Sequence, residues 1–442
     1  MSYFSTRILL TMLAGLAIVP ATAAAQNIAT QPTQAVDVLT AKADALPIIM
    51  NGGGDVPALF HTTFLNEVPE AKLRTLFATL AGQYGKANSV ASLDRVTDNQ
   101  AIAMIDYDRA LVRVELVIAP PSEASKITGL HITQTQVKGD GIATITNEIA
   151  GLDGVTAFGV WRLDQAGKLT LLSGHRVSAS MATGSTFKLS VLATLDEEIR
   201  MGKRRWSDVV PLTIKSLPSG QMQHWPDRSP VTLHTLATMM IAISDNSATD
   251  SLLALIGREK VTSFEKRNAI ALNRQYPMLS TIEAFVLKDD AQFELRRRWQ
   301  SGTYAARLAL LENNKALWKP DNARNMQNKN VPAYINEIEW FYSPTDVAKL
   351  MTWFDQKSSR EARAILGVSP GMSASDRRLW REVGYKGGSE NGVIAMNYLL
   401  TAKDGKRYIV TGSWNNAHKT VNEQIFYQYM TRAAGWLARQ PN

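Results

Sequence analysis

A serine and a lysine at helical spacing form the first pattern in this sequence that could do chemistry. Ser185 and Lys188 stand three positions apart, directly after Gly184. On a helix this spacing places both side chains on one face, one turn apart. A serine hydroxyl becomes a nucleophile when a base takes its proton, and a partly desolvated neutral lysine can serve as that base. A helix that begins at the serine also directs backbone N–H groups toward a developing oxyanion.

This pattern alone is weak evidence for a nucleophile. An ordinary capped helix start gives the same residues. The chain also holds a second serine with a lysine three positions later, Ser263 and Lys266. Further motifs must therefore decide between the two readings.

The second motif is Ser244-Asp245-Asn246, which lies between two apolar helical runs. The Ser244 hydroxyl could pass a proton, and the Asn246 amide could bind a substrate carbonyl. The alternative is a helix cap, because serine, aspartate and asparagine are the usual capping residues. Taken by itself, the motif favours the cap.

The third motif is Lys386-Gly387-Gly388-Ser389, on a segment that reads as a strand. Lys386 offers a cation for a substrate carboxylate, and the glycines let a ligand approach the backbone. The alternative is a plain bend with an exposed lysine.

The three motifs in this order resemble those of class A β-lactamases and penicillin-binding proteins, from about Asp140 to the C-terminus. The resemblance implies an acyl-enzyme at Ser185, with Lys188 as the proton acceptor. It implies three further site residues: Ser244 as proton shuttle, Asn246 as substrate-amide ligand and Lys386 as carboxylate ligand. The backbone N–H groups of Ser185 and Ser389, beside Gly388, would form the oxyanion hole.

Two departures from this family pattern bear on turnover. Gly387 stands where a hydroxyl residue is usual, so a contact to the substrate carboxylate is missing unless Ser389 supplies it. No Glu-x-x-Leu-Asn loop follows Asn246, although its glutamate is the deacylation base of class A enzymes. Glu337 and Glu339 are the nearest acidic candidates, and we interpret both as surface charges. We therefore expect acylation followed by slow deacylation.

The main expectation is hydrolysis of β-lactams, and other functions stay open. An esterase or D-alanyl-D-alanine peptidase explains the missing glutamate better. A penicillin-binding protein without turnover, such as a sensor or decoy, is a second class. A degenerate module that only interacts with the cell envelope is a third, and the intact serines and lysines argue against it.

The elements around the motifs predict an α+β, β-lactamase-like domain over 139–442. Strands come first, helices follow, and strands with a closing helix end the chain, which suits one antiparallel sheet flanked by helices plus an all-helical subdomain. Residues 45–138 read as helices followed by three or four antiparallel strands. This unit resembles the cystatin-like, or steroid-isomerase-like (NTF2-like), domain before a β-lactamase-like domain in a protein of clavulanic-acid gene clusters. Three segments carry this resemblance: 64–69, 107–109 and 126–130. We assign the unit binding or scaffolding work.

The first residues have the pattern of a targeting signal. Arg7 precedes an apolar run that ends in Ala21-Thr22-Ala23-Ala24-Ala25, the pattern of a cleaved signal peptide. We expect a signal peptide over 1–25, a flexible tether over 26–44 and a periplasmic or secreted protein. The apolar run is short for a membrane anchor, so we expect no membrane span after cleavage.

Composition excludes several chemistries. The chain of 442 residues has no cysteine, which excludes disulfides, thiolate metal sites and cysteine nucleophiles. We expect no metal, no cofactor and a small-molecule substrate, such as a β-lactam, an ester or a peptidoglycan peptide. The net charge is +8, but the basic residues are scattered, so we expect no nucleic-acid binding. The sequence does not predict the oligomeric state.

Overall fold

The computed structural model describes residues 37–271, 276–323, 326 and 330–440. The predicted signal peptide and the first part of the predicted tether lie outside these residues. No helix in the described part of the chain has the length and apolar character needed to cross a membrane. Two units with separate hydrophobic cores follow one another along the chain.

The first unit packs helices against a four-stranded antiparallel sheet. Its strands run in the order β1-β2-β3-β4. The helices are α1 (Val38–Asp44), α2 (Leu46–Met50), α3 (Val56–Leu59), α4 (Thr62–Glu67) and α5 (Glu70–Tyr84). The strands are β1 (Ala87–Thr97), β2 (Gln100–Tyr107), β3 (Ala110–Ile118) and β4 (Ile127–Val137). β2 and β3 alternate buried and less buried residues, which is the period expected of a sheet with one face on a core. The cystatin-like resemblance of this unit stays a prediction.

The tether prediction is wrong where it meets this unit. Residues 38–44 form helix α1, and its Leu39 and Ala43 are buried in the first core. The alanine- and threonine-rich composition suggested a loose segment, but two apolar side chains four positions apart are enough to dock one short helix.

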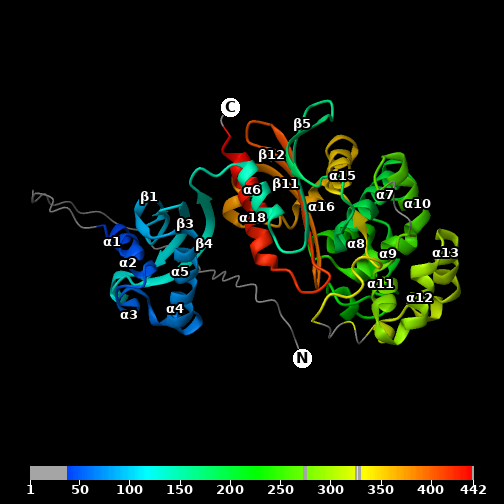
Figure 1. Ribbon diagram of the computed structural model, residues 1–442, viewed down its shortest axis with the longest axis horizontal. Helices are drawn as coiled ribbons and strands as arrows, with labels where there is room; N and C mark the ends of the chain where they lie inside the picture. Colours follow the sequence, from blue (N-terminus) through cyan, green and yellow to red (C-terminus); the bar gives the residue numbers. More distant parts are fainter. Residues whose placement is uncertain (1–36, 272–275, 324–325, 327–329, 441–442) are drawn as a thin grey trace, which may run out of the picture.

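The second unit is built on a five-stranded antiparallel sheet in the order β11-β12-β13-β5-β6. The strands are β5 (Val155–Leu163), β6 (Leu169–His175), β11 (Trp380–Glu390), β12 (Val393–Ala402) and β13 (Arg407–Asn415). On one face lie α6 (Ile142–Ala150) and the closing helix α18 (Glu423–Ala438). On the other lie α7 (Lys188–Arg200), α15 (Pro344–Lys357) and α16 (Arg360–Gly367), with the helical region beyond them (Figure 1). This arrangement confirms the predicted fold class.

The helical region fills the chain between β6 and β11. Its longer helices are α8 (Leu233–Ala242), α9 (Asn246–Ile256), α10 (Arg258–Arg267), α11 (Thr281–Lys288), α12 (Phe293–Ser301) and α13 (Tyr304–Asn313). A short helix, α17 (Ala374–Arg377), precedes β11. Two small ribbons complete the unit: β7 (Met181–Ala182) with β10 (Phe341–Tyr342), and β8 (Val209–Pro211) with β9 (Pro230–Thr232). The first ribbon lies directly before the predicted nucleophile.

The predicted domain boundary falls between β4 and α6. β4 ends at Val137 and α6 begins at Ile142. Arg432 of α18 forms ion pairs with Asp140 of this connection (3.1 Å) and Glu148 of α6 (2.6 Å). The division at 138/139 stays a prediction, and the separate cores are consistent with it.

Candidate active site

Ser185 lies on a 3-10 turn, Gly184–Phe187, that runs straight into helix α7. The residues before it are held by the β7–β10 ribbon, and Thr183 donates its N–H and its hydroxyl to the Trp340 carbonyl (3.0 and 2.8 Å). The Phe187 ring stacks on Trp340 at 4.3 Å between centroids. Ser185 itself is only half-buried. The local fold therefore fixes the turn and leaves the serine accessible.

Lys188, the first residue of α7, is completely buried and reaches the second motif. Its Nζ donates to the backbone carbonyl of Ser244 (2.7 Å) and to Asn246 Oδ1 (2.7 Å), and lies 3.0 Å from Ser244 Oγ. Burial, and then the nearby charge of Lys386, lower the pKa of Lys188 well below its usual value, although Asp250 and Asp245 oppose this shift. A lysine with a lowered pKa can hold an unprotonated amine near neutral pH.

In the loop Ser244-Asp245-Asn246, one residue caps a helix and the other two contact Lys188. Asp245 caps α9 by accepting from Ala248 N (2.9 Å), and it also accepts from Gln221 N and Met222 N (2.7 and 2.8 Å). Ser244 adopts a left-handed backbone conformation with φ of 59°, which is unusual for a residue other than glycine. The helix-cap reading is thus correct for Asp245, while the Ser244 and Asn246 side chains contact Lys188.

Lys386 of β11 approaches the same hydroxyl from the sheet. It is 3% exposed, and its Nζ lies 3.1 Å from Ser244 Oγ and also donates to the Gly387 carbonyl. Burial lowers the pKa of Lys386 to about 7. The Asn397 amide of β12 donates to the Lys386 carbonyl (3.0 Å) and to Thr186 Oγ1 (3.1 Å), which ties the strand to the serine turn. The plain-bend alternative for this motif is therefore wrong, because its lysine is buried.

The serine turn and β11 touch at Gly388. A Cβ atom on this glycine would lie 2.2 Å from the Thr183 carbonyl oxygen and 2.4 Å from Ser185 N. Gly184, with φ of +50°, approaches from the other side, since a Cβ there would lie 3.1 Å from Ser389 N. The backbone nitrogens of Ser185 and Ser389 therefore lie at one close contact between the turn and the strand, and the oxyanion hole stays a prediction.

The Tyr385 side chain occupies the space where a hydroxyl residue at position 387 would place its side chain. A Cβ atom on Gly387 would lie 2.3 Å from Tyr385 Oη, so the tyrosine hydroxyl fills this space. The Ser389 hydroxyl instead bonds to Glu423, at the start of α18, and burial raises the pKa of that glutamate. The Ser389 hydroxyl is thus engaged by Glu423.

The three motifs come together around Ser244, but one contact is not formed. In the described part of the chain no hydrogen bond joins Ser185 Oγ to Lys188 Nζ. Such catalytic contacts commonly tighten only when substrate is bound. The described residues include no group of three side chains able to hold a metal ion.

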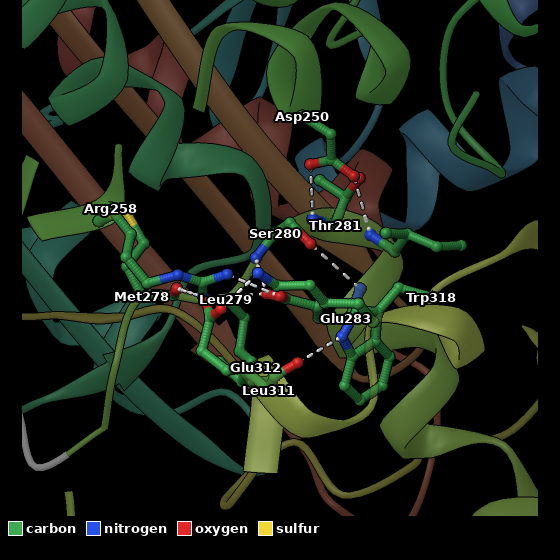
Figure 2. A network of polar contacts seen from close by, with 12 residues as sticks. Asp250, Arg258, Met278, Leu279, Ser280, Thr281, Glu283, Leu311, Glu312 and Trp318 are labelled. Carbon is green, nitrogen blue, oxygen red and sulfur yellow. Dashed lines mark hydrogen bonds and ion pairs between the residues drawn. The ribbon is translucent and has the colours of Figure 1, made fainter. Parts of the chain in front are cut away.

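Asp250, whose charge opposes the lowered pKa of Lys188, is held by four hydrogen bonds. Asp250 of α9 accepts from the Thr281 backbone N–H and hydroxyl (both 2.7 Å), from Ile282 N (3.0 Å) and from the Ser216 hydroxyl (2.7 Å). Figure 2 shows how it holds the first turn of α11 beside the Arg258–Glu283 ion pair (2.6 Å). Burial raises the pKa of Asp250 despite these bonds.

The interpretation of Glu339 as a surface charge is wrong. Its side chain is 0% exposed, and Oε1 pairs with Lys288 at 2.9 Å. Oε2 accepts from Gly184 N and from Trp340 N, both at 3.1 Å. Lys288, at the end of α11, also pairs with Glu390 at 2.6 Å. Sequence reasoning missed this cluster because its members are far apart in the chain. Glu337 is half-buried.

A cavity of about 850 Å³ lies elsewhere in the second unit, between the β7–β10 ribbon and the end of β13. Met181, Tyr276 and Asn415 are among the residues that line it. None of the seven predicted site residues borders it, so we locate the chemistry by the hydrogen-bonded lysines and not by this cavity.

Three comparisons with known proteins place these observations in context. The model of a family described as "Beta-lactamase enzyme family" matches residues 143–411, which is more than half of the chain. A search of the curated proteins gave no match.

Solved structures show similar chains at low identity. A structure described as PBP-A is 13% identical, with a TM-score of 0.46 over 67% of this chain and 93% of that chain. A β-lactamase from Sphaerobacter thermophilus is 20% identical, with a TM-score of 0.46 over 67% and 96% of the two chains. A putative class A β-lactamase, PenP, from Rhodopseudomonas palustris is 18% identical, with a TM-score of 0.46 over 68% and 99%.

Proposed function

The chain belongs to the β-lactamase enzyme family, and from this premise we propose that it is an exported hydrolase that acylates Ser185 with β-lactams and releases the acyl group slowly. The enzyme class, a serine hydrolase of the β-lactamase and penicillin-binding type, follows from the family. The site residues, the substrate, export and the slow release are our proposals.

One observation carries the assignment of the nucleophile. Lys188 is buried one helical turn after Ser185, and burial together with Lys386 lowers its pKa. Ser185 is the half-buried hydroxyl that starts the same helix. Ser263, the alternative serine, lies inside α10 and its Lys266 is exposed, so that pair lacks a desolvated base.

The proposed reaction uses these residues in sequence. Lys188 Nζ takes the proton of Ser185 Oγ as the oxygen attacks the lactam carbonyl. The N–H groups of Ser185 and Ser389 stabilise the resulting oxyanion. The lactam C–N bond then breaks, and the leaving nitrogen receives a proton through Ser244, which lies within 3.1 Å of both lysines.

The substrate is held by groups on both sides of this serine. Lys386 binds its carboxylate, and the Asn246 amide nitrogen, which already donates to the Leu217 carbonyl (3.2 Å), offers its second N–H to the substrate amide. The Tyr385 hydroxyl stands where family members usually carry the hydroxyl of the third motif.

The buried carboxylates near the motifs support slow release of the acyl group. Every aspartate and glutamate of the chain lies in the described residues. Asp245, Asp250 and Glu339 are three buried carboxylates close to the motifs, and each accepts several hydrogen bonds from the protein. Hydrogen bonds that hold a carboxylate in place occupy the lone pairs that would have to accept a proton from a hydrolytic water.

A chromogenic cephalosporin tests slow release in a stopped-flow instrument. We expect a burst of about one equivalent per active site, followed by a steady state slower by on the order of a hundredfold or more. Linear turnover without a burst would contradict slow release. Glu337→Gln would then be tested for loss of turnover, since Glu337 is half-buried, whereas Glu339 is bound to Lys288 and Gly184.

A further inference from the structure

The buried cluster of Lys288, Glu339 and Glu390 has no role in the reaction described above. Their side chains are 1%, 0% and 16% exposed. The Lys288 ammonium lies 2.9 Å from Glu339 Oε1 and 2.6 Å from Glu390 Oε1. Burying charged groups is costly, and a buried pair often contributes little to stability. The position of the cluster therefore calls for another explanation.

Each carboxylate of the cluster is linked to one of the two segments that would form the oxyanion hole, the serine turn or β11. Glu339 Oε2 accepts from Gly184 N at 3.1 Å, and Gly184 directly precedes Ser185. Glu390 directly follows Ser389 on β11. Lys288, from α11, thus links both segments whose N–H groups would stabilise the oxyanion, through a carboxylate on each side.

The charges of the cluster also bear on the oxyanion. An unpaired carboxylate beside the hole would repel the developing negative charge, and the Lys288 ammonium offsets it. Burial, and then the charge of Glu339, raise the pKa of Glu390 to about 8. Lys288 from α11 and Glu339 from the segment before β10 are the charged groups that face Glu390 in the described part of the chain. Near neutral pH the Lys288 cation therefore faces a Glu390 carboxyl group that keeps its proton.

We propose that Lys288 is a positioning residue that clamps the two sides of the oxyanion hole together, through Glu339, which binds Gly184 of the serine turn, and through Glu390 on β11. This inference rests on the proposed function, because it assumes that Ser185 is acylated. Loss of the Glu390 proton adds a negative charge beside the hole and sets two carboxylates against each other, so acylation slows.

The test follows the acylation rate against pH with a neutral activated ester, p-nitrophenyl acetate, which does not need a cation for a carboxylate. For the wild type we expect the rate to fall about tenfold between about pH 7 and pH 9, as a single group with a pKa near 8 requires. Glu390→Gln cannot lose this proton and should abolish the alkaline decline. Glu382→Gln is the matched control, because Glu382 lies on the same strand in an exposed ion pair with Arg363 (3.0 Å) and should keep the wild-type profile.

A second variant tests the clamp itself. Lys288→Met should slow acylation by the neutral ester and by penicillin G to the same extent, since both need the oxyanion hole. Rates equal to wild type in the folded Lys288→Met protein would overturn the proposal. If this variant does not fold, Glu390→Gln decides, and an unchanged alkaline decline in it overturns the proposal. Absence of any acyl-enzyme in the wild type is a different outcome, which removes the proposed function and this inference with it.

Discussion

At the scale of single residues, the site is two buried lysines that share one hydroxyl. Lys188 and Lys386 approach Ser244 Oγ at 3.0 and 3.1 Å from opposite elements. Two ammonium groups this close repel each other, and burial penalises both charges. The arrangement therefore favours one lysine as a neutral base and the other as the cation for substrate.

Lys188→Ala should abolish acylation for every substrate, because it removes the base. A loss of on the order of a hundredfold or more is expected for a general base. The measurement is the rate of adduct formation with penicillin G and with p-nitrophenyl acetate, on protein whose fold is checked by circular dichroism. Acylation of the variant at the wild-type rate by either compound would exclude Lys188 as the base.

Lys386 should distinguish anionic from neutral substrates. Burial lowers its pKa to about 7, so its charge is present below this pH and is lost as pH rises through it. The second-order acylation rate for penicillin G, relative to that for the neutral ester, should fall as pH rises through about 7. Lys386→Ala should remove this difference in pH dependence. Equal losses for both substrates in the variant would contradict the role of Lys386 as a carboxylate ligand.

At the scale of elements, the site depends on how closely β11 meets the serine turn. Gly388 is the contact point, and an added Cβ would meet backbone atoms at 2.2 and 2.4 Å. Gly388→Ala should therefore push the strand away, weaken the oxyanion hole and lower stability by about 1–3 kcal/mol. Gly82→Ala in α5 is the control, because nothing lies within 4 Å of its Cβ position. Thermal melts and acylation rates should separate the two, and a fully active Gly388→Ala protein would refute the close contact.

The sequence predicted those elements whose pattern was local. The first strands of the second unit, the strand of the third motif and the closing helix α18 stand in the order that the sequence predicts. Strand β1 was not predicted as a separate strand, because most of its residues are exposed and polar and so give no alternation. Helix α1 was assigned to a tether for the related reason that only Leu39 and Ala43 of it are buried.

The spacing and order of the motifs predict the site residues, but they do not predict the buried charged residues that hold the site in place. The motifs that carry Ser185, Lys188 and Lys386 are short strings that can be read from one sequence. The cluster of Lys288, Glu339 and Glu390 joins residues 51 and 102 positions apart. Charged residues with ordinary neighbours read as surface groups, so only the tertiary fold reveals that these are buried.

At the scale of the whole molecule, the two units have separate cores and touch through a small number of elements. β4 of the first unit approaches α17 and α18 of the second (Figure 1). Arg378 lies 3.6 Å from Glu115 across this contact, and because Arg378 is exposed and Glu115 only half-buried, the pair contributes little. None of the seven predicted site residues belongs to the first unit.

A protein cut at the boundary should therefore keep the acylation chemistry. We expect residues 139–442 to fold and to be acylated by penicillin G at a rate within about twofold of the longer chain, since interfaces of this kind resemble transient contacts. Circular dichroism and stopped-flow acylation would measure this. A folded fragment that is no longer acylated would assign the first unit a direct part in catalysis.

The central claim, an acyl-enzyme at Ser185, is tested most directly by intact-protein mass spectrometry during incubation with penicillin G. The wild type should gain the mass of one whole penicillin, because opening the lactam adds it without loss of atoms, and the adduct should persist for many turnovers of an efficient enzyme. Peptide mapping should place it on Ser185, and Ser185→Ala should gain nothing. An adduct on Ser263, or none on the wild type, would contradict the account.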